Sequence, residues 1–430
     1  MTTYARRLGL FSGTMAVVGG IIGGGIFRTP ATVAERLGTP GLVLLAWVLG
    51  GIVALFGAFC WGELGQRRPR AGGGYVYLRE TFGPLSAFLY GWTLVLVIAT
   101  GAIAAVAVTF ADYTLALLDL QHRYSVPLAV AAIVFLAAIN YIGVRPAAIT
   151  QNIFTILKLV ALAALIGAGI LLTTPTASYR PLPPSTAGGG ALGSALVPVL
   201  FTYGGWQQTN FIAEEIIEPE RNLPRALVLG VTIVVTVYIL TNLAYLRVLG
   251  HAGLAASTAP AADTMQAVLG PIGGKIIAAG IALSTFGFLN LVILVTPRVL
   301  QAMAADGVFF RRFAALHPAY QTPTAAIVAL ATLAVLLTLT GTFGQLVDWV
   351  TFGDWIFFGL TAAALFVYRS REPRAGTFRV PGYPATVIVF VLAAAYVVYS
   401  AVVSNPRNAA LGAGLIGLGI PAFLYWRSRP

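Results

Sequence analysis

Residues 19–27 of the chain read Gly-Gly-Ile-Ile-Gly-Gly-Gly-Ile-Phe, a glycine cluster inside an apolar segment. Glycine weakens a helix, and in lipid an unwound backbone persists only where protein or a water-filled cavity satisfies it. A second cluster, Tyr-Gly-Gly-Trp at 203–206, lies five apolar segments further along. One cluster alone is typical of close helix packing through small residues. Two clusters in register with a five-segment repeat instead indicate a pair of interrupted helices around a binding site.

The composition indicates a membrane protein. Of the 430 residues, 58% are hydrophobic and 9% are charged, whereas a soluble domain carries about 25% charged residues. These values exclude a soluble enzyme, a disordered protein and a nucleic-acid binder. The net charge of +12 does not indicate a nucleic-acid partner, because the basic residues stand in loops between apolar runs, as is typical of a chain surrounded by membrane lipid.

Apolar segments of membrane-spanning length recur along the whole chain. We therefore expect an all-α integral membrane protein with 12 transmembrane helices, folded as a single transmembrane transporter domain over residues 1–430. The segments lie near 11–34, 41–65, 84–111, 126–142, 148–172, 192–214, 226–249, 274–299, 324–340, 344–368, 384–403 and 409–426.

The loops also predict an orientation. Alternate loops hold about 18 basic residues on one side and about six on the other. Lys and Arg favour the cytoplasmic side, so we expect a multi-pass protein of the cell (inner) membrane with both termini cytoplasmic. A miscount by one helix would remove this asymmetry, which supports an even number of spans.

A membrane-embedded enzyme is a competing class. It would need His, Cys or paired Asp at helical spacing. His122, His251 and His317 fall in or beside loops far apart in the chain, and Cys60 is the only cysteine. We therefore expect no catalytic residues, no metal and no cofactor. A channel or a structural protein is a third class, and the paired interruptions favour a stoichiometric carrier over it.

Three motifs give a more specific resemblance. The chain resembles the amino acid–polyamine–organocation (APC) superfamily over nearly its whole length, and within it the L-type amino acid transporters and their bacterial relatives. The motifs are 19–27 as quoted; Tyr-Gly-Gly-Trp at 203–206 with Asn210, Phe211, Glu214, Glu215 and 219–225; and Ala-Leu-Ser-Thr-Phe-Gly at 282–287 with Asn290, Pro297, Arg298, 305–307, His317 and Pro318.

The resemblance implies a LeuT-like fold, with a five-plus-five inverted repeat and discontinuous helices 1 and 6. Repeat one would span about 11–172 and repeat two about 192–368, with peripheral helices 11 and 12 at about 384–426. Heteromeric relatives are linked to a heavy chain by a cysteine in the loop between helices 3 and 4. Segment 112–125 has no cysteine, so we expect no disulfide-linked heavy chain and a stand-alone prokaryotic carrier.

An amino acid backbone is zwitterionic, and a free charged side chain at the bilayer midplane would be costly. Exposed N–H groups in the first break can face the carboxylate, and carbonyls at both breaks can accept the ammonium protons. The family assigns these segments the same roles. Phe201 matches the aromatic residue that closes over the substrate in L-type relatives, and Gly204 would leave room for the substrate side chain. The expected substrate-binding residues are Ile21, Gly23, Gly24, Gly25, Phe201, Thr202, Tyr203, Gly204, Gln207, Asp354 and Trp355.

Two of these residues depart from the family pattern. Relatives often have a small hydroxyl residue where this chain has Gly24, and many have Asn where it has Gln207. Both departures change the lining of the expected pocket. A third residue, Asp354, would favour a cationic substrate such as arginine, or a polyamine, if it faces the pocket. The alternative is that it pairs with another internal polar group.

Lys158 lies in the middle of the fifth apolar segment, about ten residues from either end, too far to reach an interface easily. A charge inside the membrane is a functional candidate by default. Sodium-coupled members of the fold hold Na⁺ between helices one, five and eight. The resemblance implies that the Lys158 ammonium takes this position, bridging carbonyls near 20–22 and the hydroxyls of Ser284 or Thr285.

These observations lead to one functional prediction with an alternative. We expect sodium-independent amino acid transport, as an exchanger or permease, by alternating access, with neutral L-amino acids favoured. The alternative is a proton-coupled transporter of cationic amino acids or polyamines. If Lys158 titrates, it could couple transport to protons; if it stays charged, it is a fixed cation. The sequence leaves these two readings open.

Overall fold

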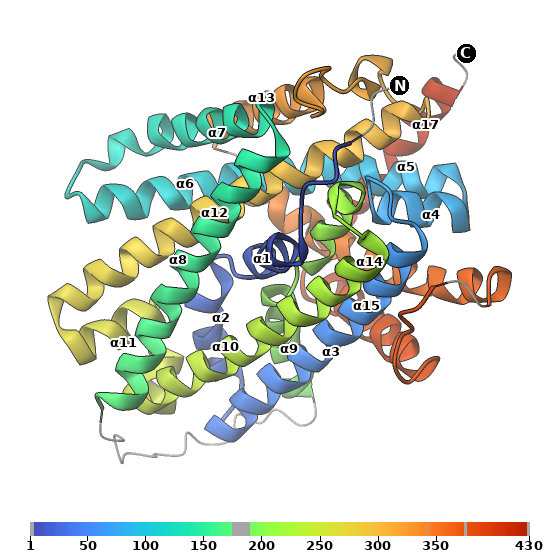
Figure 1. Cartoon of the computed structure of the whole chain (residues 1–430). Helices are drawn as coiled ribbons and strands as arrows, with labels where there is room; N and C mark the ends of the chain where they lie inside the picture. The colour runs from blue at the N-terminus through green and yellow to red at the C-terminus, as the bar shows by residue number, and fades with distance from the viewer. Residues whose placement is uncertain (1–3, 174–189, 342, 374–375, 428–430) are drawn as a thin grey trace.

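The computed structural model describes residues 4–173, 190–341, 343–373 and 376–427 (Figure 1). Within these ranges the chain is helical, and its one β-type contact is an isolated bridge between Leu8 and Ile216. The α-helices are α1 (Leu10–Ile21), α2 (Thr29–Arg36), α3 (Pro40–Arg67), α4 (Gly74–Phe82), α5 (Pro84–Thr93), α6 (Thr100–Leu117), α7 (Ser125–Tyr141), α8 (Val144–Leu171), α9 (Gly190–Thr202), α10 (Pro219–Ala256), α11 (Pro260–Leu269), α12 (Pro271–Ala305), α13 (Thr324–Thr340), α14 (Phe343–Arg371), α15 (Ala385–Ser404), α16 (Pro406–Gly417) and α17 (Gly419–Arg427).

Shorter helical turns connect several of these helices. Four are 3₁₀ turns and one is a π-helical stretch that joins α5 to α6 without a break. They are η1 (Gly25–Phe27), η3 (His122–Tyr124), η4 (Trp206–Glu215), η5 (Arg311–Ala314) and the π-helical η2 (Leu94–Ala99).

Eight helical segments in the described ranges are long and apolar enough to cross a bilayer, which makes this a multi-pass membrane protein. Four expected spans are not among these eight: 11–34, 192–214, 324–340 and 344–368. Two of them, 11–34 and 192–214, contain the glycine clusters, and a break shortens each continuous helix. The eight segments are Pro40–Arg67, Pro84–Leu117, His122–Tyr141, Val144–Leu171, Pro219–Ala256, Pro271–Ala305, Ala385–Ser404 and Pro406–Arg427.

Both expected helix interruptions are present. The first apolar segment divides into α1 and α2, with unwound backbone after Ile21 and the short turn η1 between them. The sixth divides after Thr202 into α9 and the 3₁₀ helix η4. At 12 residues, α1 is roughly 18 Å long, which is little more than half of a bilayer core of about 30 Å. Each of the two segments therefore contains a half-helix that ends deep inside the protein.

The two breaks pack backbone against backbone. Gly205 has a φ of +117°, which only glycine adopts readily. A Cβ atom added to Gly205 would clash with the carbonyl oxygen of Gly20, and one added to Gly20 would lie 2.9 Å from the carbonyl oxygen of Gly205. Figure 1 shows α1 at the centre of the bundle, with α8 and α12 on one side and α10, backed by α3, on the other.

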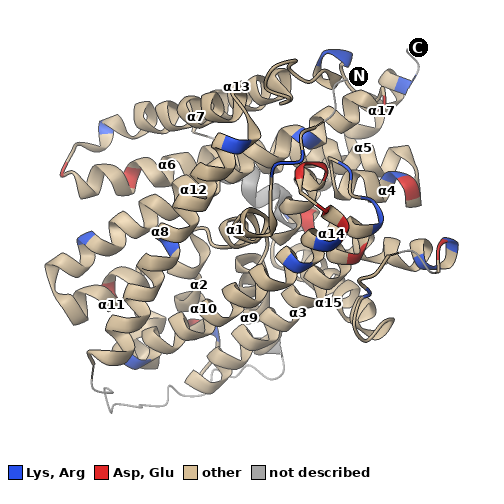
Figure 2. Ribbon diagram, in the orientation of Figure 1, with Lys and Arg blue, Asp and Glu red and all other residues tan. Residues whose placement is uncertain are grey.

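Several ion pairs lie at one end of the bundle. The carboxylate of Glu63, fully buried near the end of α3, pairs with Arg67 at 2.8 Å and with Arg369 at 2.5 Å. A second buried pair joins Arg298 on α12 to Glu215 at 2.8 Å. Figure 2 shows acidic and basic residues gathered around α4 and the end of α14. Removing one partner of such a buried pair is strongly destabilising, because the other charge is left uncompensated.

The Gly20–Gly205 contact yields a stability prediction. We expect Gly205→Ala to destabilise the fold by roughly 2–4 kcal/mol, because the added Cβ meets backbone and the φ is strained. Gly24→Ala is the matched control, since nothing lies within 4 Å of its added Cβ and its φ is −82°. The measurement is thermal unfolding of the detergent-purified protein. Equal melting temperatures for the two variants would contradict the backbone contact.

Candidate functional site

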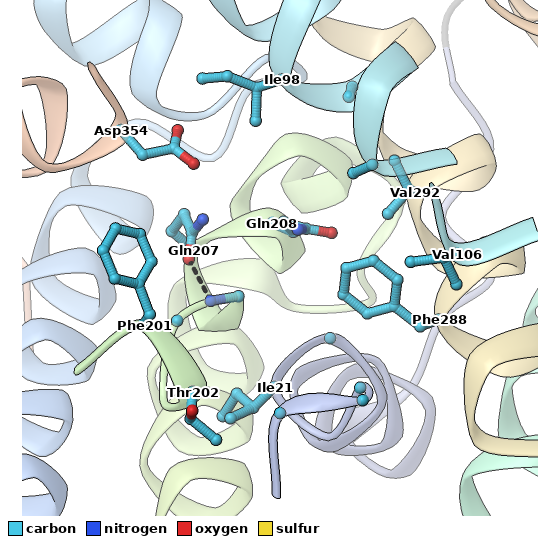
Figure 3. Close-up of a pocket in the computed structure, with 18 of the residues that line it drawn as sticks. Ile21, Ile98, Val106, Phe201, Thr202, Gln207, Gln208, Phe288, Val292 and Asp354 are labelled. Carbon is cyan, nitrogen blue, oxygen red and sulfur yellow. Dashed lines mark hydrogen bonds between the residues drawn. The ribbon is translucent and has the colours of Figure 1, made fainter. Parts of the chain in front are cut away.

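A cavity of about 510 Å³ lies at the two helix breaks (Figure 3). Every residue that the sequence singled out for a substrate site lines it, except Tyr203. The lining also includes residues from α6, α12 and α14, so five separate parts of the chain meet here. From the two breaks the lining residues are Gly20, Ile21, Gly23, Gly24, Gly25, Thr29, Phe201, Thr202, Gly204, Gly205, Gln207, Gln208 and Phe211.

Tyr203 is fully buried beside the cavity rather than in its lining. Its hydroxyl donates to the carbonyl of Trp47 at 3.1 Å, and its ring packs against Trp47 and Tyr238, with centroids 5.7 and 5.1 Å away. Tyr203 therefore anchors the second break to α3 and α10.

The first break presents free backbone donors to the cavity. The N–H groups of Gly24 and Gly25 make no hydrogen bond with any residue in the ranges that the structure describes, and both glycines are partly exposed. The N–H of Gly23 donates to the carbonyl of Ile21 at 3.0 Å. Two of the three expected donors are therefore open, and the third is engaged.

The carbonyls at the breaks are largely engaged. The carbonyl of Ile21 also accepts a hydrogen bond from the hydroxyl of Tyr238 at 3.1 Å, and the same hydroxyl lies 3.3 Å from the carbonyl of Thr202. The carbonyl of Phe201 accepts one bond, from the N–H of Gly204 at 3.0 Å. A carbonyl oxygen has two lone pairs, so Phe201 keeps one acceptor position.

Sequence reasoning missed two tyrosines on α10. The hydroxyl of Tyr238 links the ends of both half-helices, and the hydroxyl of Tyr245 donates to the carbonyl of Ile26 at 3.3 Å. Both side chains are fully buried. Their spacing of seven residues in an apolar helix, which places them on one face, is the signal that could have identified them.

The side walls of the cavity are apolar. Phe201 stands on one side with its ring edge-on to that of Trp355, at a centroid distance of 6.2 Å. Figure 3 shows Phe288 and Val292 on the opposite side, with Ile98 above them. Ile98 belongs to the π-helical stretch η2, a distortion that frequently occurs at functional sites.

Gln207 and Asp354 are two of the polar residues that line this space. Gln207 accepts a hydrogen bond from the N–H of Gly205 through its Oε1 at 3.0 Å, which directs its amide nitrogen away from the break (Figure 3). Asp354 on α14 lines the cavity and lies near Gln207 and Ile98 in Figure 3. Its carboxylate has no hydrogen-bond or ion-pair partner among residues 4–173, 190–341, 353–373 and 376–427, so the expected alternative of an internal polar partner is not seen among these residues.

Lys158 is fully buried and does not line the cavity. Its ammonium donates to the carbonyls of Ile22 at 2.7 Å and Gly19 at 3.2 Å. Ser284 approaches the same break, with its hydroxyl 3.3 Å from the carbonyls of Ile22 and Gly23. The hydroxyl of Thr285 instead donates within α12, to Ile281 at 2.8 Å. The structure thus joins Lys158 and Ser284 at one carbonyl and leaves Thr285 apart.

The described part of the chain contains no cluster of three or more His, Cys, Asp or Glu side chains that could hold a metal ion. The arrangement can act chemically through oriented backbone dipoles, one buried ammonium and one cavity carboxylate. It can bind and release a polar solute.

Comparison with known proteins agrees with this arrangement. A family model for amino acid permeases matches residues 8–424. The b(0,+)-type amino acid transporter 1 of Mus musculus is 31% identical over 94% of this chain and 84% of its own length. The Asc-type amino acid transporter 1 of Homo sapiens is 32% identical, over 99% and 83% of the two chains. The Large neutral amino acids transporter small subunit 2 of Oryctolagus cuniculus is 32% identical, over 99% and 82%. The chain therefore belongs to the amino acid permease family of the APC superfamily, whose members are transporters and not enzymes.

Proposed function

We propose that this protein carries amino acids across the cytoplasmic membrane by sodium-independent alternating access, with neutral L-amino acids as its main substrates. The observation that carries the proposal is the pair of N–H groups of Gly24 and Gly25, which make no hydrogen bond with the described residues and belong to the lining of a cavity where two broken helices meet. The names of the relatives, which are amino acid transporters, support the substrate class.

The break orients a zwitterion. Its carboxylate would accept hydrogen bonds from Gly24 and Gly25, where the backbone supplies donors without a buried cation. Its ammonium would donate to the free acceptor position on the carbonyl of Phe201. The side chain would then extend between the rings of Phe201 and Phe288 into an apolar space, which suits neutral side chains.

The architecture that we propose has 12 spans. Repeat one covers about 11–172 and repeat two about 192–368, related as in LeuT-like transporters, and helices at about 384–426 are peripheral. Figure 1 places the first described residues, which lead into α1, and the last helix, α17, at the same edge of the bundle, which suits an even number of spans with cytoplasmic termini. The single cysteine, Cys60, is fully buried, which supports a carrier without a disulfide-linked heavy chain.

Lys158 is the basis for sodium independence. Its ammonium supplies a positive charge to the carbonyls of Gly19 and Ile22, where a bound cation would otherwise be needed to satisfy them. A chain-borne cation cannot be exchanged with solution, so no Na⁺ gradient would drive this step. Lys158 then acts as a fixed cation in an exchanger or as a proton site in a symporter.

A second candidate function is proton-coupled transport of cationic amino acids or polyamines. The half-buried carboxylate of Asp354 in the cavity lining favours it, because a cationic substrate group would offset the cost of holding that charge away from bulk water. This candidate shares the cavity and the broken helices with the first. It differs in which substrates compete for the site.

Uptake into proteoliposomes tests the proposal. Vesicles that are empty or preloaded with unlabelled amino acid would receive labelled neutral, cationic and acidic amino acids, without sodium, with and without an inward proton gradient. Uptake that needs internal amino acid identifies an exchanger, and uptake driven by protons into empty vesicles identifies a symporter. If no amino acid enters under any condition while a polyamine does, the second candidate replaces the first.

Replacing Lys158 tests its role directly. We expect Lys158→Ala to lower sodium-free uptake at least about tenfold, because two buried carbonyls lose their donor. Lys275→Ala is the matched control, since Lys275 is exposed and pairs only with Asp119 at 3.7 Å. The initial rate of labelled leucine uptake is the measurement. Unimpaired uptake by the Lys158 variant would remove the basis for sodium independence.

Replacing Asp354 separates the two candidate functions. If neutral amino acids are the main substrates, Asp354→Asn should keep uptake of leucine within about twofold, because the change preserves shape and removes only charge. Uptake of arginine, where present, should fall about tenfold or more, because its cation loses the only carboxylate of the cavity lining. Asp119→Asn, at an exposed loop position, is the control. A leucine rate that falls together with that of arginine would contradict a role confined to the substrate side chain.

A further inference from the structure

A row of buried polar side chains runs along α8 outside the cavity. Gln151, Thr155 and Lys158 are spaced by four and three residues, so they share one face of the helix. None of them is more than 1% exposed, and none lines the cavity. Polar groups in this position are expensive unless each has a partner, so their partners show what the row is for.

One side of the row contacts the backbone of α1. The hydroxyl of Thr155 donates to the carbonyl of Met15 at 3.2 Å, and Lys158 donates to the carbonyls of Gly19 and Ile22. The amide of Gln151 lies against Gly19, where an added Cβ would clash with it. The contacted positions on α1 are themselves spaced by four and three residues. These contacts hold α8 against the last turns of α1, between Met15 and the break.

The other side of the row is tied to α12 and α7. Gln151 accepts a hydrogen bond from Asn290 on α12 at 3.1 Å and donates to Thr155 at 3.2 Å. Asn290 also donates to the carbonyl of Ala147 at 3.1 Å and accepts from Asn140 on α7 at 3.1 Å. All of these side chains are buried. The bonds form one chain from α7 through α12 and α8 to α1.

We propose that Gln151 and Asn290 are positioning residues that hold α8 in register with α12, so that the ammonium of Lys158 meets the carbonyl of Ile22. The inference rests on the role given to Lys158 in the proposed function. Two bonds from Asn290 to α8, at Ala147 and Gln151, fix the rotation of α8 about its axis. A rotation of α8 would carry Lys158 away from α1. Any movement of α1 would then break the α1–α8 bonds while α8 stays with α12.

Chemical labelling of lysine tests this placement without a transport assay. Lysine occurs only at positions 158 and 275, so the exposed Lys275 is an internal standard for the buried Lys158. The full-length protein, purified in detergent, is exposed briefly to an amine-methylating reagent, and both sites are quantified by mass spectrometry. Asn290→Leu removes the bonds of Asn290 to Ala147, Gln151 and Asn140. We expect it to raise the modification of Lys158 relative to Lys275 at least roughly fivefold, the factor for one lost buried hydrogen bond.

Two further variants sharpen the test. Gln151→Leu should raise the same ratio, and the double variant should show no more than the larger single effect, because both changes cut one chain of bonds. Asn242→Leu is the matched control: Asn242 is fully buried on α10 and its amide donates only within its own helix, to Tyr238 at 2.8 Å. The control should lower the melting temperature to a similar extent and leave the Lys158 ratio unchanged.

The outcomes separate this inference from the proposed function. An unchanged Lys158 ratio in both the Asn290 and Gln151 variants would overturn the inference, and so would an equal rise in the Asn242 control. Labelling does not depend on transport. A Lys158→Ala protein with normal uptake would therefore remove the role proposed for the lysine, while the labelling ratios would still report whether Asn290 and Gln151 position it.

Discussion

The structure depends on the contact between Gly20 and Gly205. An unwound backbone inside a membrane survives only where other groups satisfy it, and here each break is covered first by the other. Because neither glycine tolerates a Cβ, the two half-helix ends come closer than side chains would allow. The enclosing helices then complete the arrangement: α10 contributes Tyr238 to both breaks, and α8 contributes Lys158 to the first.

The side chains that contact the backbone of the first break all act as hydrogen-bond donors, and this bears on which ligand groups the break can bind. Lys158, Ser284, Tyr238 and Tyr245 are all donors that engage backbone carbonyls. Their bonds satisfy acceptors and leave the N–H groups of the turn open. The break is therefore short of acceptors, and the ligand group that supplies them best is an anion. The proposed preference for a carboxylate rests on which backbone groups the protein already satisfies, since the described lining residues include no cationic side chain.

The sequence predicted the parts of this site that lie within single segments. The glycine clusters predicted both helix breaks, and the position of Lys158 in an apolar run marked it as a functional candidate. Both signals lie within one segment of the sequence. Partners that meet only through helix packing were missed. Tyr238, Gln151 and Asn140 are single polar residues in apolar helices, and their pairing depends on how α7, α8, α10 and α12 rotate against each other. Tyr203 shows the same limit: it stands between two lining residues, yet the unwound turn directs it toward α3. Length and composition identified eight spans. Two of the other four are divided by the breaks into pieces that are too short, and α13, at 17 residues, is also short.

Lys158 beside the first break and Asp354 in the cavity lining have different surroundings, and this difference distinguishes the candidate functions. Lys158 is satisfied by carbonyls and tied through α8 to α12, so its charge belongs to the structure in this conformation. Asp354 lines the cavity and has no such partner among residues 4–173, 190–341, 353–373 and 376–427, so its charge is open to a group that enters the cavity. A neutral amino acid leaves that carboxylate to a proton or to water, whereas a cationic side chain meets it directly. We therefore propose that the α14 side of the cavity sets substrate preference, and that the α8 side decides whether a sodium ion takes part.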